Sequence, residues 1–125
     1  MEGRTSSYIA NNILAFNTAG PNKKHALNEC CQLNTGSTNV YTHNLIYGNT
    51  DSIYFLDPAS INDSPVNKEP QFIKYTGDET GDYRLQSGSP AKSAGTAAQA
   101  PRTDYAGSPR APREGACDIG AYEDR

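Results

Sequence analysis

The segment YIANNILAFNT, Tyr8 to Thr18, recurs 32 residues later as VYTHNLIYGNT, Val40 to Thr50. The second copy keeps two asparagines, the apolar pair that follows the first of them, and the final threonine. In register, these matches are Asn12 on Asn44, Ile13-Leu14 on Leu45-Ile46, Asn17 on Asn49 and Thr18 on Thr50. Self-similarity at a fixed period of this size is typical of stacked repeats, so each copy predicts one coil of short β-strands.

The repeated asparagines have a physical reason in such a stack. Asparagine tolerates left-handed turn geometry and can bond its own backbone, which suits the corner of a coil. Coils stacked at the strand spacing of about 4.8 Å would bring Asn12 next to Asn44 and Asn17 next to Asn49. We therefore expect these side chains to hydrogen-bond to one another in a ladder.

Composition favours one all-β domain over residues 1–125. The chain is 35% hydrophobic with 11 glycines and 8 prolines, which suits many turns, and no segment has the apolar spacing of a long helix. Short apolar runs follow the repeat at Ser52–Leu56 and Phe72–Tyr75. We expect β-coil units over residues 8–75 and a C-terminal closing segment over residues 76–125.

Charge and hydropathy argue against several partners. The net charge is −3 and the cationic residues have no aromatic platform between them, which disfavours nucleic acid. No apolar run approaches the roughly 20 residues of a membrane span. The N-terminal stretch MEGRTSSYIANN lacks the apolar core of a signal peptide, so the sequence as written predicts a cytoplasmic protein.

The three cysteines, Cys30, Cys31 and Cys117, leave two interpretations open. They can be small buried hydrophobic residues, as free cysteines commonly are. Alternatively, one disulfide joins Cys117 to either Cys30 or Cys31, because adjacent cysteines rarely pair with each other.

The closing segment contains signals for a short helix, a tail and a last strand. Ser89 suits a helix N-cap and Gly95 suits the residue past the helix end, which predicts a one-turn helix at Pro90–Ala94. Residues 96–112 are rich in Ala, Pro, Gly and Arg and predict a tail that wraps the surface. Alternating apolar residues in Cys117–Tyr122 predict a half-buried final strand.

Three ordered segments carry a family resemblance: GDYRLQSGSPAKSAGT (Gly81–Thr96), DYAGSPR (Asp104–Arg110) and CDIGAYE (Cys117–Glu123). They resemble the C-terminal end of right-handed parallel β-helix proteins of the pectate-lyase-like group. The resemblance implies an all-β fold, here a short truncated right-handed parallel β-helix with a one-turn C-terminal helix and a wrapped tail. It also implies a link to carbohydrate, and secretion if the chain is an excerpt.

No combination of residues predicts catalysis. Glycoside hydrolysis needs two carboxyls flanking one bond, and no spacing pairs two of the acidic residues in this way. The turn DETGD offers Asp78, Glu79 and Asp82 as candidate calcium ligands, because hard oxygen ligands in a flexible turn suit that ion. Ordinary turn chemistry is the competing explanation, and no other cofactor is expected.

Sugar binding is the functional interpretation that the aromatic residues support best. The chain has eight tyrosines and no tryptophan, and aromatic faces bury sugar rings while amides bond hydroxyls. The candidates are Tyr41, Tyr47, Asn44 and Asn49 on the second repeat unit. On a strand, half of such tyrosines point inward and serve as core instead.

The sequence therefore favours a non-catalytic binding or interaction module with carbohydrate as the candidate ligand. One alternative is a partial or degraded polysaccharide lyase or glycoside hydrolase, and another is a structural remnant without a ligand. Because the coil begins abruptly at Tyr8-Ile9, its first strands would expose their edges and the coil interior. We expect a homo-oligomer joined through this open N-terminal coil, most simply about a two-fold axis.

Overall fold

The structure is a computed structural model that describes residues 7–17, 25–28, 39–49, 51–54, 61–63, 67–110 and 116–124. Within these ranges the regular secondary structure consists of nine short strands and no helix, which confirms the all-β class. In this part of the chain, no helix has the length and apolar character needed to cross a membrane.

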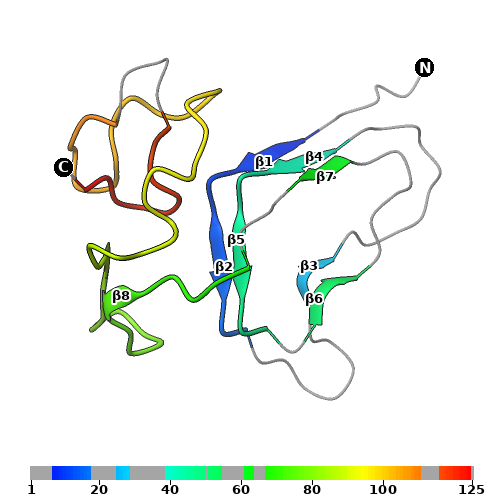
Figure 1. Ribbon diagram of the computed structural model, residues 1–125, viewed down its shortest axis with the longest axis horizontal. Coiled ribbons are helices and arrows are strands. Elements are labelled where there is room, and N and C mark those ends of the chain that lie inside the picture. The colour runs from blue at the N-terminus through cyan, green and yellow to red at the C-terminus, as the bar shows by residue number, and fades with distance from the viewer. Residues whose placement is uncertain are drawn as a thin grey trace.

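The repeat forms three parallel strand pairs, with one further strand added to the first pair (Figure 1). The first unit supplies β1 (Tyr8–Ala10), β2 (Ile13–Ala15) and β3 (His25–Asn28), and the second supplies β4 (Val40–Thr42), β5 (Leu45–Tyr47) and β6 (Asp51–Tyr54). The pairs are β1 with β4, β2 with β5 and β3 with β6, and β7 (Ile61–Asp63) pairs with the other edge of β4. The register places Tyr8 opposite Val40 and Ile13 opposite Leu45, which confirms the alignment of the repeat.

The asparagine ladder predicted from the repeat is present. The Asn44 side-chain oxygen accepts hydrogen bonds from the Asn12 backbone N–H at 3.0 Å and from its side-chain amide at 3.0 Å. The Asn49 oxygen likewise accepts from the Asn17 backbone at 2.9 Å and its amide at 2.8 Å. These bonds join the first repeat unit to the second at two corners.

The left-handed residue at each corner precedes the ladder asparagine, contrary to the expectation that the ladder asparagine itself takes this geometry. At the first corner Asn11 (φ 61°) and His43 (φ 49°) occupy equivalent positions, and at the second corner Phe16 (φ 59°) and Gly48 (φ 64°) do so. The sharp turn frees the next residue to direct its side chain along the stack. At each corner, one residue thus makes the left-handed turn and the next residue, an asparagine, makes the ladder hydrogen bonds.

The closing segment packs against the side of the strand pairs, beside β1, β2 and β5 in Figure 1, where it is drawn green to red. Just before it lies β8 (Phe72–Lys74), which forms an antiparallel hairpin with the first strand of the segment, β9 (Asp82–Leu85). The core that joins coil and closing segment consists of Leu45, Leu85, Ala91 and Ile119, with Ile13, Tyr47, Phe72 and Ala94 packed around it. Leu45 comes from β5, so the outer face of the β2–β5 sheet, rather than the end of the stack, receives the segment.

The predicted one-turn helix at Pro90–Ala94 is wrong, because the chain there forms hydrogen-bonded turns. Ser89 acts as expected of a cap, since its hydroxyl accepts from the Ala91 N–H at 3.2 Å. It also donates to the Pro70 carbonyl at 2.5 Å, which ties the turn to the start of the hairpin. Ser93 takes a left-handed φ of 51°, which stops helical geometry before a full turn can repeat.

The predicted final strand at Cys117–Tyr122 is also wrong. Asp118 is buried along with its neighbours Cys117 and Ile119, so the expected alternation of buried and exposed residues fails. The backbone bonds of this segment go to four separate places: Cys117 O accepts from Gly95, Ile119 N donates to Ala91, Gly120 N donates to Asn11, and Ala121 O accepts from Tyr105. Pairing with scattered segments replaces the continuous ladder of a strand.

Cys117 is a free and buried thiol, and Cys30 and Cys31 lie outside the described residues. Its sulfur donates to the Thr96 carbonyl at 3.2 Å. Burial, reinforced by the negative charge of Glu123, raises the pKa of the thiol and keeps it protonated for this bond. The structure therefore has a small buried side chain here, as the first of the two cysteine interpretations expects.

Candidate functional site

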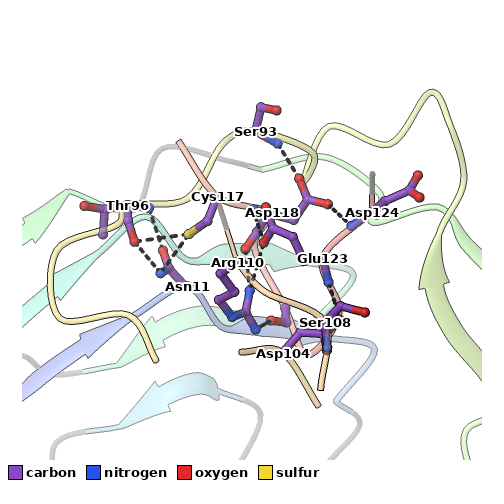
Figure 2. A network of polar contacts seen from close by, with 11 residues as sticks. Asn11, Ser93, Thr96, Asp104, Ser108, Arg110, Cys117, Asp118, Glu123 and Asp124 are labelled. Atoms are coloured by element: carbon purple, nitrogen blue, oxygen red, sulfur yellow. Dashed lines mark hydrogen bonds and ion pairs between the residues drawn. The ribbon is translucent and has the colours of Figure 1, made fainter. Parts of the chain in front are cut away.

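One asparagine connects the first coil to the tail (Figure 2). The Asn11 side-chain amide donates to the Thr96 carbonyl at 2.7 Å, and its side-chain oxygen accepts from the Thr96 N–H at 2.8 Å. Its backbone carbonyl accepts from Gly120 N at 2.9 Å. Asn11 thus satisfies both backbone groups of one tail residue while its left-handed φ turns the chain between β1 and β2.

Gly95 is required by this contact. A Cβ at this position would lie 2.8 Å from the Asn11 side-chain oxygen and 2.9 Å from the Cys117 carbonyl oxygen. The second of these is backbone and cannot move away cheaply. Gly95 therefore allows close approach of three segments, which is a different role from the helix stop predicted from the sequence.

A buried ion pair holds the C-terminal residues together. Arg110 and Glu123 lie 3.3 Å apart, with side-chain exposures of 9% and 7%. The Arg110 guanidinium also donates to the carbonyls of Gly120 at 2.8 Å and Asp118 at 3.3 Å. Its Nε is buried and lacks a hydrogen-bond partner in the described part of the structure.

Two buried carboxylates extend this network (Figure 2). Asp118 accepts from the backbone N–H of Ser93 at 2.8 Å and of Asp124 at 2.9 Å. Asp104 accepts from Ser108 N at 2.7 Å and from Glu123 N at 2.9 Å. Each carboxylate joins backbone from two parts of the closing segment, so in this irregular region side chains take the place of strand ladders.

The hydrogen bond from Glu123 N is the main cause of a lowered pKa at Asp104. Because the folded pKa lies below the unfolded value of about 3.9, Asp104 stabilises the fold above that pH, and the stabilisation is lost as pH falls through its folded pKa. The hydrogen bond to Arg84 lowers the pKa of Asp82 to about 2, so Asp82 also loses its stabilising effect as the pH falls. We predict that the free energy of unfolding falls below about pH 4.

Urea unfolding followed by circular dichroism between neutral and acid pH checks this prediction. The Asp104→Asn variant should be less stable at neutral pH and should lose less stability on acidification than the wild type. An unchanged acid slope in this variant would contradict the role given to Asp104.

A cleft of about 280 Å³ opens where the first coil meets the tail. One wall is the corner between β1 and β2, with Tyr8 and Asn12, and the other is the tail, with Gln99 and Pro101. Asn11 and Arg110 also line it. Tyr8 is 38% exposed, and Asn12, Gln99 and Pro101 are exposed as well. The cleft therefore combines an accessible aromatic ring, a proline ring, the Gln99 amide and the side-chain oxygen of Asn12, whose nitrogen is already bonded to Ala10 and Asn44.

The four sugar-binding candidates from the sequence lie outside this cleft. Tyr41 is 7% exposed and Asn44 is fully buried, so both are interior residues that a ligand cannot reach in this structure. Asn49 is half-buried and donates to the Leu14 carbonyl at 2.7 Å as part of the ladder. Tyr47 is half-buried and packs edge-on against Phe16, with ring centres 5.8 Å apart.

Two of the candidate calcium ligands, Asp78 and Glu79, lie in the exposed hairpin loop, and the third, Asp82, begins β9 and is half-buried. One Asp78 oxygen accepts from the hydroxyls of Thr76 at 2.9 Å and Thr80 at 2.7 Å, and the bond from Thr80 is the main cause of the lowered Asp78 pKa. Asp82 pairs with Arg84. Within the described ranges no three acidic, histidine or cysteine side chains gather as a metal site would need. Calcium binding by Asp78, Glu79 and Asp82 stays a prediction.

Comparisons with known proteins found no matching family model, no similar curated protein and no similar solved structure. The cleft therefore has to be interpreted from its own residues. Sequence reasoning missed it because its walls lie about ninety residues apart and the tail wall has no regular secondary structure. The exposed Tyr8 at the start of the first repeat unit was the one signal that could have pointed to it.

Proposed function

We propose that the chain is a non-catalytic binding module, built as a short right-handed parallel β-helix, which binds carbohydrate in the cleft between Tyr8 and Pro101. The observation that carries the proposal is the cleft lining, which places an exposed tyrosine and a proline beside the amides of Asn12 and Gln99. The in-register repeat pairs and the asparagine ladder support the β-helix architecture.

Carbohydrate is the ligand class whose two kinds of surface match this lining. The C–H faces of a sugar ring pack on aromatic and proline rings, and its hydroxyls bond to amides. The volume of about 280 Å³ is at the small end for ligand pockets, which suits a terminal sugar or a short segment of a chain. A purely apolar ligand would bury the Gln99 amide and the Asn12 side-chain oxygen without partners, which is costly.

The charges around the cleft support binding rather than hydrolysis. Hydrolysis of a glycosidic bond needs two carboxyls on either side of it, and none of the described residues lining the cleft is Asp or Glu. Arg110 is the one Lys, Arg, Asp or Glu among the described lining residues, and its side chain is nine-tenths buried and bonded to Glu123, so it has little freedom to move toward a ligand. Orientation of a ligand is the role that remains for this lining.

The Tyr8→Ala variant should weaken glycan binding by about tenfold, since it removes the aromatic face that a sugar would cover. The measurement is a glycan array with the wild type, followed by titration calorimetry with the best glycan. Tyr105→Ala is the matched control, because Tyr105 is 81% exposed and does not line the cleft. It should bind as the wild type does.

Each of the other outcomes has a definite meaning. If Tyr105→Ala weakened binding as much as Tyr8→Ala, the ligand would not lie in the cleft. If the wild type released reducing or unsaturated sugar from polysaccharides, the partial or degraded enzyme would be the better description. If the wild type bound no glycan, the carbohydrate proposal would fail and the structural remnant would be favoured.

A further inference from the structure

The first coil is less protected than the second, although the two have equivalent sequences. Ile9 and Leu14 are only half-buried, whereas the residues opposite them in the second coil, Tyr41 and Ile46, are 7% and 6% exposed. For Tyr41 the cause is that β4 has a strand on each side, β1 and β7, whereas β1 has only β4 among the described strands. The interior of the coil is thus partly open at this end.

The backbone of β1 is also open at this end. Strand β1 lies at the edge of the sheet β1–β4–β7, and no described strand pairs with its outer side. Ser7 O accepts from Val40 N, so by alternation the backbone groups of Ser7 and Ile9 face β4 while those of Tyr8 and Ala10 face outward. The Asn12 amide caps the outward Ala10 carbonyl at 2.9 Å, which leaves the Tyr8 groups and the Ala10 N–H available.

The asparagine ladder ends here with unused acceptors. The side-chain oxygens of Asn44 and Asn49 each accept two hydrogen bonds from the preceding coil. Within the described residues the corresponding oxygens of Asn12 and Asn17 accept no hydrogen bond, and both side chains are exposed. A strand-bearing partner would satisfy these oxygens in the way that the first coil satisfies those of the second.

We propose that a second copy of this chain covers the open end, first coil against first coil, with β1 antiparallel to its counterpart across a two-fold axis. A partner that covers this face needs strand edges that match the arrangement of strands in the first coil. The same face of a second copy has this arrangement. Residues 7–17 carry no charged side chain, so two copies meet without repulsion. A two-fold contact uses both open ends and closes, whereas a head-to-tail contact would continue into a filament.

The dimer contact and the carbohydrate cleft share Tyr8, Ala10 and Asn12, so the oligomeric state is measured without glycan, and failure of either proposal is read from its own experiment. The test is light scattering after size exclusion at micromolar concentration, where the wild type should have twice the mass of the chain. Ala10→Pro removes the outward N–H and places a ring at the contact while leaving the bonds to β4 in place. It should be monomeric with a native circular dichroism spectrum, and the matched control Ala10→Ser should remain dimeric.

If Ala10→Pro does not fold, hydrogen exchange of the wild-type amides tests the dimer proposal instead. In the wild type the amides of Tyr8 and Ala10 should exchange at least tenfold more slowly at dimer-forming concentration than after dilution. A monomeric wild type at micromolar concentration would overturn the proposal. So would a dimeric, native Ala10→Pro, concentration-independent exchange at these two amides, or an open-ended series of larger masses.

Discussion

Replacing Arg110 with alanine should lower the free energy of unfolding by about 3–5 kcal/mol, the range for removing one partner of a buried ion pair. The variant leaves the Glu123 carboxylate nine-tenths buried without its cation. It also removes the donors to the carbonyls of Gly120 and Asp118, and these carbonyls belong to the segment that docks on Asn11. Urea unfolding at neutral pH measures the loss.

The control for this prediction is the exposed ion pair between Arg84 and Asp82. The Arg84 side chain is 63% exposed, so water replaces it readily, and Arg84→Ala should change the stability little. A third variant, Arg110→Lys, keeps the charge but has no planar fork to reach two carbonyls and a carboxylate at once, so it should lie between the other two. If Arg110→Ala were no more destabilised than Arg84→Ala, the buried network would not be holding the tail.

The parallel strand pairs of the repeat were predictable because their information is local and repeated. The register of β2 on β5 follows from aligning Ile13 with Leu45, and the ladder follows from aligning Asn12 with Asn44. A slip of one residue would break both at the same time, since it would move the apolar side chains to the opposite face. The apolar positions and the asparagine positions therefore independently predict the same register.

The closing segment was less predictable because its contacts are long-range and mostly side chain to backbone. Ser89 has the chemistry of a helix cap, and it does accept from Ala91, but its hydroxyl also bonds to Pro70, nineteen residues away. In the alternating pattern of Cys117–Tyr122, Asp118 occupies a position predicted to be exposed. It is buried instead, because the backbone N–H groups of Ser93 and Asp124 donate to its carboxylate. Such partners have no periodic signature in a sequence.

The candidate site was also hard to predict, because the burial of its residues depends on long-range contacts. Tyr41 and Asn44 have suitable side chains for sugar, but the stacking of the coil that they help to build buries them. The cleft instead takes Tyr8 from the open first coil and Gln99 and Pro101 from the irregular tail. Residue type alone could not distinguish the buried tyrosine from the exposed one; that depended on which coil has a neighbour on both sides.

The second large effect is expected at Leu45, which is fully buried where the coil meets the closing segment. Leu45→Ala should lower the free energy of unfolding by about 3 kcal/mol, because it removes buried apolar surface and leaves a cavity between Leu85, Ala91 and Ile119. Thermal or urea unfolding measures it.

Ile13 provides a matched comparison for Leu45, because it is the register partner on β2 and faces the same side of the sheet. It is only partly buried, so Ile13→Ala should cost clearly less than Leu45→Ala. Equal losses would mean that the core does not centre on the second coil. Larger loss at Leu45 would mean that the closing segment gains its stability from the outer face of β5, since β-coil strands of three residues have little apolar surface of their own.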